Sequence, residues 1–170
     1  MEDKIVEGLA YVLPALVTGG VAYYILSAFI KQDNNEKKFA ALLEKKKESL
    51  PIKLQAYERM LLFCERINPV KLLIRVNPIG DKTESYLHLL IANIEQEFEH
   101  NLVQQLYISD DSWKAVVATK LAIIAKLRKI SETSETAIEL REKVLINYTK
   151  EENPTETVVA FLKQEVKKLL

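Results

Sequence analysis

The sequence predicts an all-α protein, with one N-terminal transmembrane helix, a helical stalk, and a compact bundle of about five to six helices. Three observations lead to this prediction. An uncharged apolar run lies near the N-terminus, apolar residues recur at three- and four-residue spacing through most of the remainder, and only 4 Gly and 5 Pro interrupt 170 residues. So few turn residues disfavour an antiparallel β fold. We therefore expect an anchor at residues 1–30, a stalk at 31–50 and a helical domain at 51–170.

The predicted anchor is the stretch GLAYVLPALVTGGVAYYILSAFI, residues 8–30, which contains no charged side chain. As a helix it would be about 34 Å long, enough to cross a hydrocarbon core of about 30 Å. A cleaved signal peptide would have a basic leader and a shorter apolar run. Residues 2–7 instead carry three acidic side chains and one lysine. We therefore expect an uncleaved anchor that contacts the lipid bilayer through residues 8–30.

Lysines on either side of this run predict its orientation. Only Lys4 precedes it, whereas six lysines follow it closely: Lys31, Lys37, Lys38, Lys45, Lys46 and Lys47. Basic residues stay on the cytoplasmic side of a membrane. The sequence therefore predicts a single-pass protein of the cytoplasmic (inner) membrane, with its N-terminus outside and its C-terminal domain in the cytoplasm. The sole cysteine, Cys64, agrees with a reducing compartment.

The first soluble helices follow from composition and proline positions. Residues 32–48 are rich in Lys, Glu and Ala, which favours a stalk helix that ends near Leu50-Pro51, because the residue before a proline avoids the helical conformation. A second helix is expected from Pro51 to about Ile67. Since it is apolar on two sides, we place it in the middle of the bundle.

The later helices are predicted from caps and periodicity. A short helix should cover residues 70–76, and a capping-box pattern at residues 81–84 should open a long helix to about Tyr107. The apolar row expected to face the core on this long helix is Leu87, Leu90, Ile91, Ile94, Phe98, Leu102 and Leu106. Ser109 and Asn153 are expected to cap further helices, with a polar interruption at residues 131–135.

Motifs of catalysis are absent from the sequence. The net charge is zero, which gives no reason to expect a nucleic-acid partner. Nucleotide-binding loops and nucleophile elbows do not occur, and one Cys with two His is too few for a zinc site. We expect no cofactor, no catalytic residue and no metal ligand. Glu97 and His100 nevertheless form half of a di-iron bundle motif, so the alternative function is a metal-binding or catalytic bundle centred on them.

A row of polar residues on the long helix is the most informative feature. Asn101 and Gln105 fall inside the predicted apolar arc, with Glu97 at its edge. Buried polar groups need partners. Arg59 and Arg66, on the central helix, are the natural partners of Glu97. Two interpretations remain open: the row is an internal network that fixes helix register, or it lines a groove for a partner segment.

Small residues also gather on one side of the predicted anchor. Ala15, Gly19 and Ala22 lie on one face of a helix, and Ala15 with Gly19 has the small-x-x-x-small spacing. This spacing lets two helices approach closely in lipid. We expect this face to contact another transmembrane helix.

Two segments carry a family resemblance. LQAYER at residues 54–59 and EFEHNLVQQLY at 97–107, followed by Ser109 and Trp113, resemble an uncharacterised bacterial family of single-span membrane proteins with a cytoplasmic helical domain. The resemblance is close over residues 50–113 and loose over the anchor. It implies the same architecture and carries no activity.

The expected function is that of a membrane-tethered helical adaptor or accessory subunit of an inner-membrane protein complex. Its span, stalk and compact domain, which lack reactive constellations, favour binding over catalysis. The expected partners are other membrane or membrane-associated proteins, including a second copy of this chain.

Overall fold

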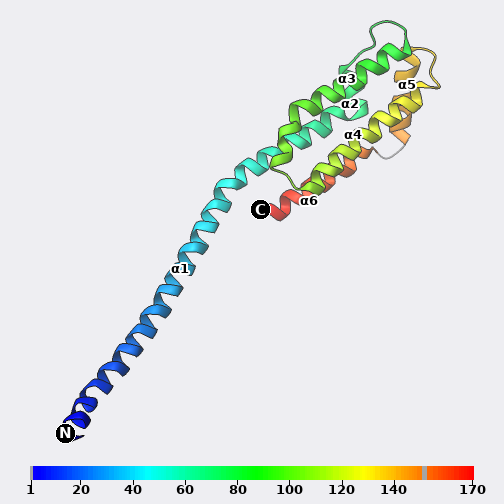
Figure 1. Cartoon of the computed structure of the whole chain (residues 1–170). Helices are drawn as coiled ribbons and strands as arrows, with labels where there is room; N and C mark the ends of the chain where they lie inside the picture. Colours follow the sequence, from blue (N-terminus) through cyan, green and yellow to red (C-terminus); the bar gives the residue numbers. More distant parts are fainter. Residues whose placement is uncertain (1, 151–152) are drawn as a thin grey trace. The chain divides into compact units, whose positions relative to one another are not determined.

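The protein is all-α, as predicted. The computed structural model describes residues 2–150 and 153–170, with side chains described at 16–149 and 153–170. Within these residues the chain forms six α-helices and one short 3₁₀ helix (Figure 1). They are α1 (Glu2–Ile67), α2 (Pro69–Arg75), α3 (Thr83–Asn101), η1 (Leu102–Leu106), α4 (Asp110–Ser131), α5 (Ala137–Lys150) and α6 (Pro154–Leu169).

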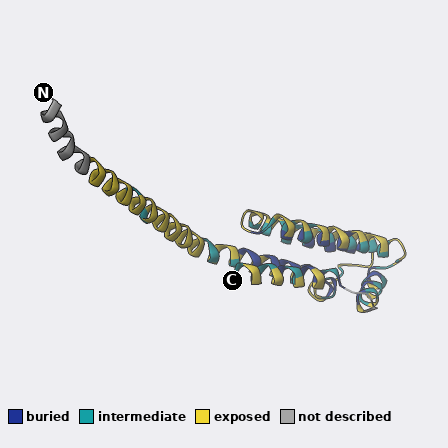
Figure 2. Cartoon of the chain, turned by 90° about the horizontal axis from the view of Figure 1, so that it is seen from below, coloured by how far each residue is buried: buried dark blue, intermediate teal, exposed yellow. Residues whose placement is uncertain are grey.

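Contacts divide the chain into two units, Met1–Ser49 and Leu50–Leu170. In the first unit, almost every described side chain from residue 16 onward is exposed. The buried side chains of the described residues all belong to the second unit (Figure 2). The hydrophobic core of the described residues therefore lies within Leu50–Leu170.

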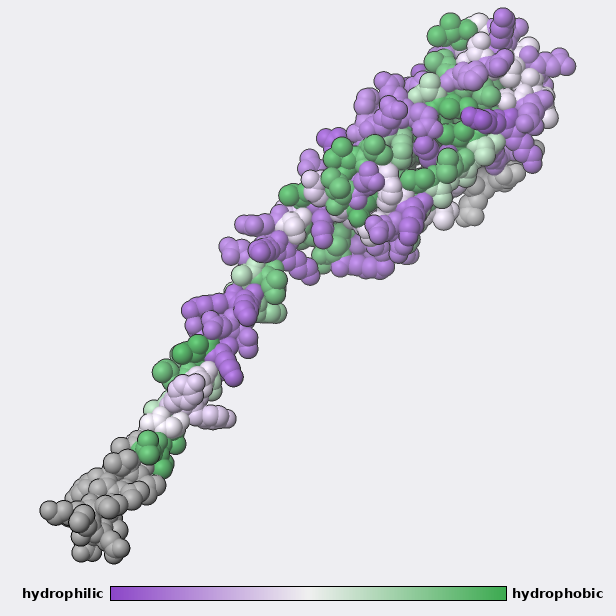
Figure 3. Space-filling view, in the orientation of Figure 1, coloured by the Kyte–Doolittle hydropathy of each residue, from purple (hydrophilic) through white to green (hydrophobic). Residues whose placement is uncertain are grey.

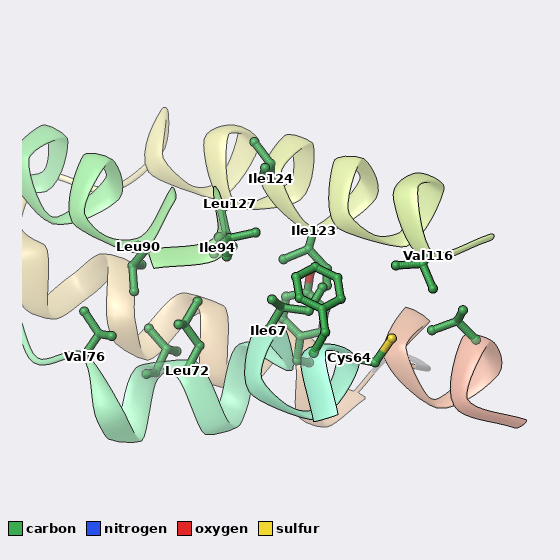
Figure 4. Close-up of a cluster of buried hydrophobic side chains, with 14 of the residues drawn as sticks. Cys64, Ile67, Leu72, Val76, Leu90, Ile94, Val116, Ile123, Ile124 and Leu127 are labelled. Atoms are coloured by element: carbon green, nitrogen blue, oxygen red, sulfur yellow. The ribbon is translucent and has the colours of Figure 1, made fainter. Parts of the chain in front are cut away.

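The last turns of α1 contribute one buried face to that core. Six of their side chains are at most 4% exposed: Ala56, Tyr57, Met60, Phe63, Cys64 and Ile67. Their spacing of three and four residues places them on one face of the helix, within an arc of about 120°. Figure 4 shows core side chains of α1 and α2 on one side, and those of α3 and α4 on the other. The central position that the two-sided apolar pattern predicted is wrong, because the opposite face of this segment is open: Ile52 and Leu62 are 49% and 58% exposed, and Arg59 and Arg66 are exposed as well.

The remaining helices pack around α4, which contacts α3, α5 and α6, while α5 also contacts α2 and α3. Local caps fix where several of them begin. The Ser109 hydroxyl accepts a hydrogen bond from the Ser112 N–H at 3.2 Å, and Asn153 Oδ1 accepts one from the Thr155 N–H at 3.1 Å. Asn68 caps α2 in the same way, accepting from the Val70 N–H at 3.1 Å. Each cap satisfies a backbone donor that the first helical turn leaves without a partner.

The predicted break at Leu50-Pro51 is wrong, because α1 continues through it to Ile67. A proline inside a helix removes the hydrogen bond to the carbonyl four residues earlier, here that of Lys47. Both Lys47 and Pro51 are exposed, so water can replace the missing donor. The stalk and the predicted second helix are therefore one element in the secondary structure.

The predicted long helix begins at Thr83, within the segment 81–84 expected to open it, but it ends earlier than the predicted Tyr107. Lys82 holds the N-cap position without a side-chain hydrogen bond, and the Asp81 carbonyl accepts a hydrogen bond from the N–H of Ala137, at 2.9 Å. At the other end, Asn101 Nδ2 donates to the Glu97 carbonyl at 2.7 Å and competes with the helical backbone bond. The chain then tightens into η1.

This tightening changes which residues face the core. The period falls from 3.6 to about three residues per turn, so the apolar row loses its register. Leu102 and Leu106, both predicted to be buried, are exposed, with Leu106 at 73%. The core-facing part of the row therefore ends at Phe98.

Among the residues whose side chains are described, no helix is both long and apolar enough to cross a membrane. The predicted span begins at Gly8, and the side chains of residues 8–15 lie outside those that are described.

We expect a fragment of residues 50–170 to fold by itself, because it contains the whole described core. Circular dichroism of the purified fragment should show a largely helical spectrum and one cooperative thermal transition. Phe63→Ala is the control, and it should lower the free energy of unfolding by about 3–5 kcal/mol by leaving a cavity at the centre. An unfolded fragment at neutral pH, or a spectrum of β type, would contradict this expectation.

Candidate functional site

A polar pocket of about 320 Å³ lies between α1 and α3, in the second unit. Its lining combines charged, polar and apolar side chains: Arg59, Leu62, Phe63 and Arg66 from α1, and Glu97, His100 and Asn101 from α3. Four of the eight residues predicted to bind a partner therefore line one pocket. They come from segments thirty to forty positions apart, and only the packing of α1 on α3 brings them together.

The pocket has an aromatic base. The Phe63 ring of α1 packs against the Phe98 ring of α3, with 5.8 Å between their centroids. Phe98 stacks in turn on Trp113 of α4 at 5.3 Å. Lys120 of α4 places its ammonium 4.1 Å from the centre of the Phe98 ring and pairs with Glu95 at 2.7 Å. These contacts join α1, α3 and α4, and so hold the two walls of the pocket in place.

Glu97 is the electrostatic centre of the pocket. Its side chain is 15% exposed, and Arg66 Nε lies 3.0 Å from its Oε1. The predicted pairing of Arg66 with Glu97 is therefore confirmed. Arg75 of α2 adds a second guanidinium, whose Nη2 is 3.8 Å from the same oxygen. The arginines are more exposed than the carboxylate, with Arg66 at 55%, so the network lies at the edge of the core and is partly hydrated.

Sequence reasoning missed Arg75. Its place on α2, which follows a break at Asn68, gives no periodic relation to Glu97 or Arg66. The sequence does show Arg75 as the basic residue in the last turn of a short helix, a position from which a side chain can interact favourably with carbonyl groups at a helix end. Its Nη2 indeed donates to the Arg66 carbonyl, at the end of α1, at 3.4 Å.

The other predicted residues of this row have different positions. Arg59 lines the pocket two turns from Arg66 and is exposed. Asn101 is half-buried and uses its amide on the carbonyl of Glu97, within its own helix. Gln105 lies on η1, is exposed, and is not among the lining residues. The change to a 3₁₀ helix at Leu102 separates it from the row.

The small residues of the predicted anchor belong to the first unit. Ala15 lies outside the residues whose side chains are described, whereas Gly19 and Ala22 are exposed. A Cβ atom built on Gly19 meets nothing within 4 Å. Contacts within the described chain therefore do not require glycine at this position.

The structure also shows where the two residues of the predicted di-iron half-motif, Glu97 and His100, lie. His100 is exposed at the rim of the pocket. Oε1 of Glu97 faces two guanidinium groups, which compete with any metal ion for it. In the part of the chain that the structure describes, no group of three or more His, Cys, Asp or Glu could hold a metal ion.

In chemical terms the pocket is a set of donors beside an apolar surface. Arg59, Arg66 and His100 offer N–H groups, and one carboxylate partly neutralises them. Guanidinium groups bind carboxylates and phosphates through paired N–H donors. The neighbouring η1 carries three exposed apolar side chains, Leu102, Val103 and Leu106, and the exposed Tyr107 follows it directly. Figure 3 shows hydrophobic surface beside hydrophilic surface on this unit.

Glu97→Ala should lower the free energy of unfolding by about 1 kcal/mol. The substitution leaves Arg66 and Arg75 without their carboxylate, but both arginines remain partly hydrated, which keeps the loss small. Chemical denaturation measures the effect. Glu99→Ala is the matched control, an exposed glutamate on the same helix, and should change stability by less than about 0.5 kcal/mol. Equal losses in the two variants would mean that the Glu97 network does not contribute.

Cys64 should be unreactive in the folded protein. It is fully buried, and burial, with a smaller contribution from Glu65, raises the pKa of its thiol from 9.0 to about 12. At neutral pH the thiolate that reacts with electrophiles is therefore almost absent. Alkylation with iodoacetamide at pH 8 should be at least about a hundredfold slower in the native protein than in denaturant. Similar rates in the two conditions would show that the site opens readily.

A model of a family of unknown function (DUF7935) matches residues 3–169 of the chain. No curated protein and no solved structure matches the chain. The matched region includes nearly all of both units, and it confirms the resemblance to an uncharacterised family. The chain belongs to this family of unknown function.

Proposed function

We propose that this protein is a membrane-tethered helical adaptor or accessory subunit. In this proposal, residues 8–30 anchor it in the cytoplasmic (inner) membrane, with its N-terminus outside. The unit Leu50–Leu170 then lies in the cytoplasm and binds other membrane or membrane-associated proteins, without catalysing a reaction.

The observation that carries the proposal is the surface of α1 between residues 16 and 30. None of these side chains is charged, and nine large apolar ones are at least half exposed: Leu16, Val17, Val21, Tyr23, Tyr24, Ile25, Leu26, Phe29 and Ile30. Burying one such side chain is favourable by about 1.5–3 kcal/mol. A helix with apolar residues on every side needs an apolar environment all around it, which a bilayer supplies.

Flanking residues support the same interpretation. With residues 8–15 included, the uncharged stretch reaches the thickness of a hydrocarbon core. Lys31 follows it directly, and Lys37 and Lys38 follow one to two turns later. These three lysines are exposed and could reach anionic headgroups, as the positive-inside rule expects of a cytoplasmic flank.

Binding of proteins is proposed from the polar pocket. Arg59 presents an exposed guanidinium beside Leu62, and the pocket adjoins the apolar residues of η1. A partner segment with an acidic side chain and neighbouring apolar residues would match both surfaces. Arg59 and Arg66 would then orient the partner, and Leu102, Val103 and Leu106 would supply the buried area.

The anchor is tested by placing charge within it. Wild-type protein should remain with membranes after alkaline carbonate extraction, and the double variant Val17→Arg, Val21→Arg should be released. Each arginine costs about 2.5–3.5 kcal/mol near the middle of a span. Phe39→Arg with Leu42→Arg is the matched control, because both residues are exposed and apolar but lie outside the predicted span.

The control variant should stay in the membrane fraction. The orientation is tested separately: a reporter that is active only outside the cytoplasm should be inactive when fused after Leu170. Release of the wild-type protein by carbonate would contradict the anchor, and an active reporter would reverse the proposed orientation.

A further inference from the structure

A long groove separates α1 from α6 on the side of α1 opposite the polar pocket. It consists of two adjoining cavities, of about 400 Å³ and about 380 Å³, and Lys163 lines both. The first is lined by Leu54, Tyr57, Glu58 and Leu61 from α1, and by Leu162, Lys163, Val166 and Lys167 from α6. The second is lined by Glu65, Asn68 and Lys71, and by Thr155, Glu156, Val159, Ala160 and Lys163. All of these residues belong to the unit Leu50–Leu170.

The two helices run antiparallel along the groove. Leu54, the first of the α1 lining residues, shares a cavity with Val166 and Lys167 near the end of α6. At the other end, Asn68 Nδ2 donates to Thr155 Oγ1 at 3.2 Å and joins the two helices. The lining thus extends from Leu54 to Asn68 on one side and from Thr155 to Lys167 on α6, which corresponds to a length of about 18–21 Å.

Packing explains why the groove stays open. α6 packs mainly on α4. Tyr57 is drawn inward, because its hydroxyl accepts a hydrogen bond from the Ser109 N–H at 3.2 Å. Leu54, Leu61 and Val166 are left half-buried as the walls of the first cavity. Two helices with apolar facing walls form the surface against which a third helix packs.

Charges are distributed unevenly along the groove. Lys163 and Lys167 stand one turn apart on the α6 side, with Glu58 on the α1 side, and all three are exposed. Glu165 of α6 pairs with Lys168, and within the described residues neither Lys163 nor Lys167 has an ion-pair partner. In the second cavity Lys71 pairs with Glu65, and α6 contributes the exposed charges of Glu156 and Lys163. The apolar end is therefore basic on its α6 side, and at the polar end Glu156 supplies an exposed carboxylate.

We propose that this groove binds an amphipathic helix of a partner protein, about 12–14 residues long. Its apolar residues, spaced three and four apart, enter between Leu61 and Val166, and its acidic residues face Lys163 and Lys167. A basic residue three turns away faces Glu156. This inference rests on the proposed adaptor function and names the element by which the adaptor binds its partner.

The test uses the full chain in its native cells, with a photoreactive residue in place of one exposed side chain. Glu58→p-benzoylphenylalanine and Lys167→p-benzoylphenylalanine place the probe on the two sides of the groove. Both should crosslink to one partner protein, at a segment that mass spectrometry maps to a helix bearing Asp or Glu. The same probe at Leu121 or Ile146, which are exposed on α4 and α5, should not capture that segment.

Charge reversal then tests how the partner is recognised. The double variant Lys163→Glu, Lys167→Glu should reduce the crosslink yield of the probe that replaces Glu58 at least about tenfold. Changing the acidic residues of the mapped partner helix to lysine should restore this yield. Arg128→Glu with Lys129→Glu, on the exposed end of α4, is the matched control and should leave the yield unchanged.

Crosslinks only to lipid, to a second copy of this chain, or to a segment without acidic residues would overturn the inference, and so would the absence of a crosslink. A failure of the groove proposal is distinguished from a failure of the adaptor function by purifying the wild-type chain in mild detergent and identifying the proteins that co-purify with it. If they still co-purify with the Lys163, Lys167 variant, the adaptor function stands and the groove has no part in it. If the wild type retains no protein, both proposals fail.

Discussion

The fold depends on the burial of one face of the last turns of α1 against the other helices. Phe63, Cys64 and Ile67 are at most 1% exposed and belong to one buried cluster with residues of α2, α3 and α4. Two anchoring contacts fix this segment: the Phe63 ring against Phe98, and the Tyr57 hydroxyl at the start of α4. A helix that is buried on one face borders its neighbours along the two edges of that face. The polar pocket and the apolar groove are those two borders, so both exist because α1 is where it is.

Two ion pairs of different character join α3 to its neighbours. Lys120 is 8% exposed, and it tolerates burial because Glu95 and the face of the Phe98 ring both stabilise its charge. The Glu97 network has the reverse arrangement, because the carboxylate, at 15% exposed, is less accessible than the guanidinium groups of Arg66 and Arg75. Removing a partner from a buried charge is costly, whereas an exposed arginine can turn to water or to another anion. The first pair therefore suits a structural role, and the second leaves donors available for recognition.

Features that depend on interactions between residues close in the sequence could be predicted, whereas most of those that depend on the packing of separate helices could not. Breaks at Asn68, Ser109 and Asn153 could be predicted, because each depends on a side chain and a backbone N–H two or three positions away. Glu97 with Arg66 could be predicted as well, since both stand out as polar on apolar helices. Whether the helix continues at Pro51 and at Asn101 could not be predicted. At Pro51 it depends on hydration of the Lys47 carbonyl, and at Asn101 on competition between the side-chain amide and the backbone for the Glu97 carbonyl. The groove beside α6 was missed because it arises from the distance between two helices.

The two borders of α1 differ in what they could contribute to binding. In the polar pocket, a partner's carboxylate would exchange hydrogen bonds with water for hydrogen bonds with arginine, a net gain of about 1.5–3 kcal/mol at best. In the groove, each large apolar side chain removed from water is worth about 1.5–3 kcal/mol, and the first cavity has room for more than one. Affinity would therefore come mainly from the groove, and orientation from Arg59 and Arg66. Since both borders share α1, a substitution that tilts this helix would alter them together, whereas one on α6 would alter the groove alone.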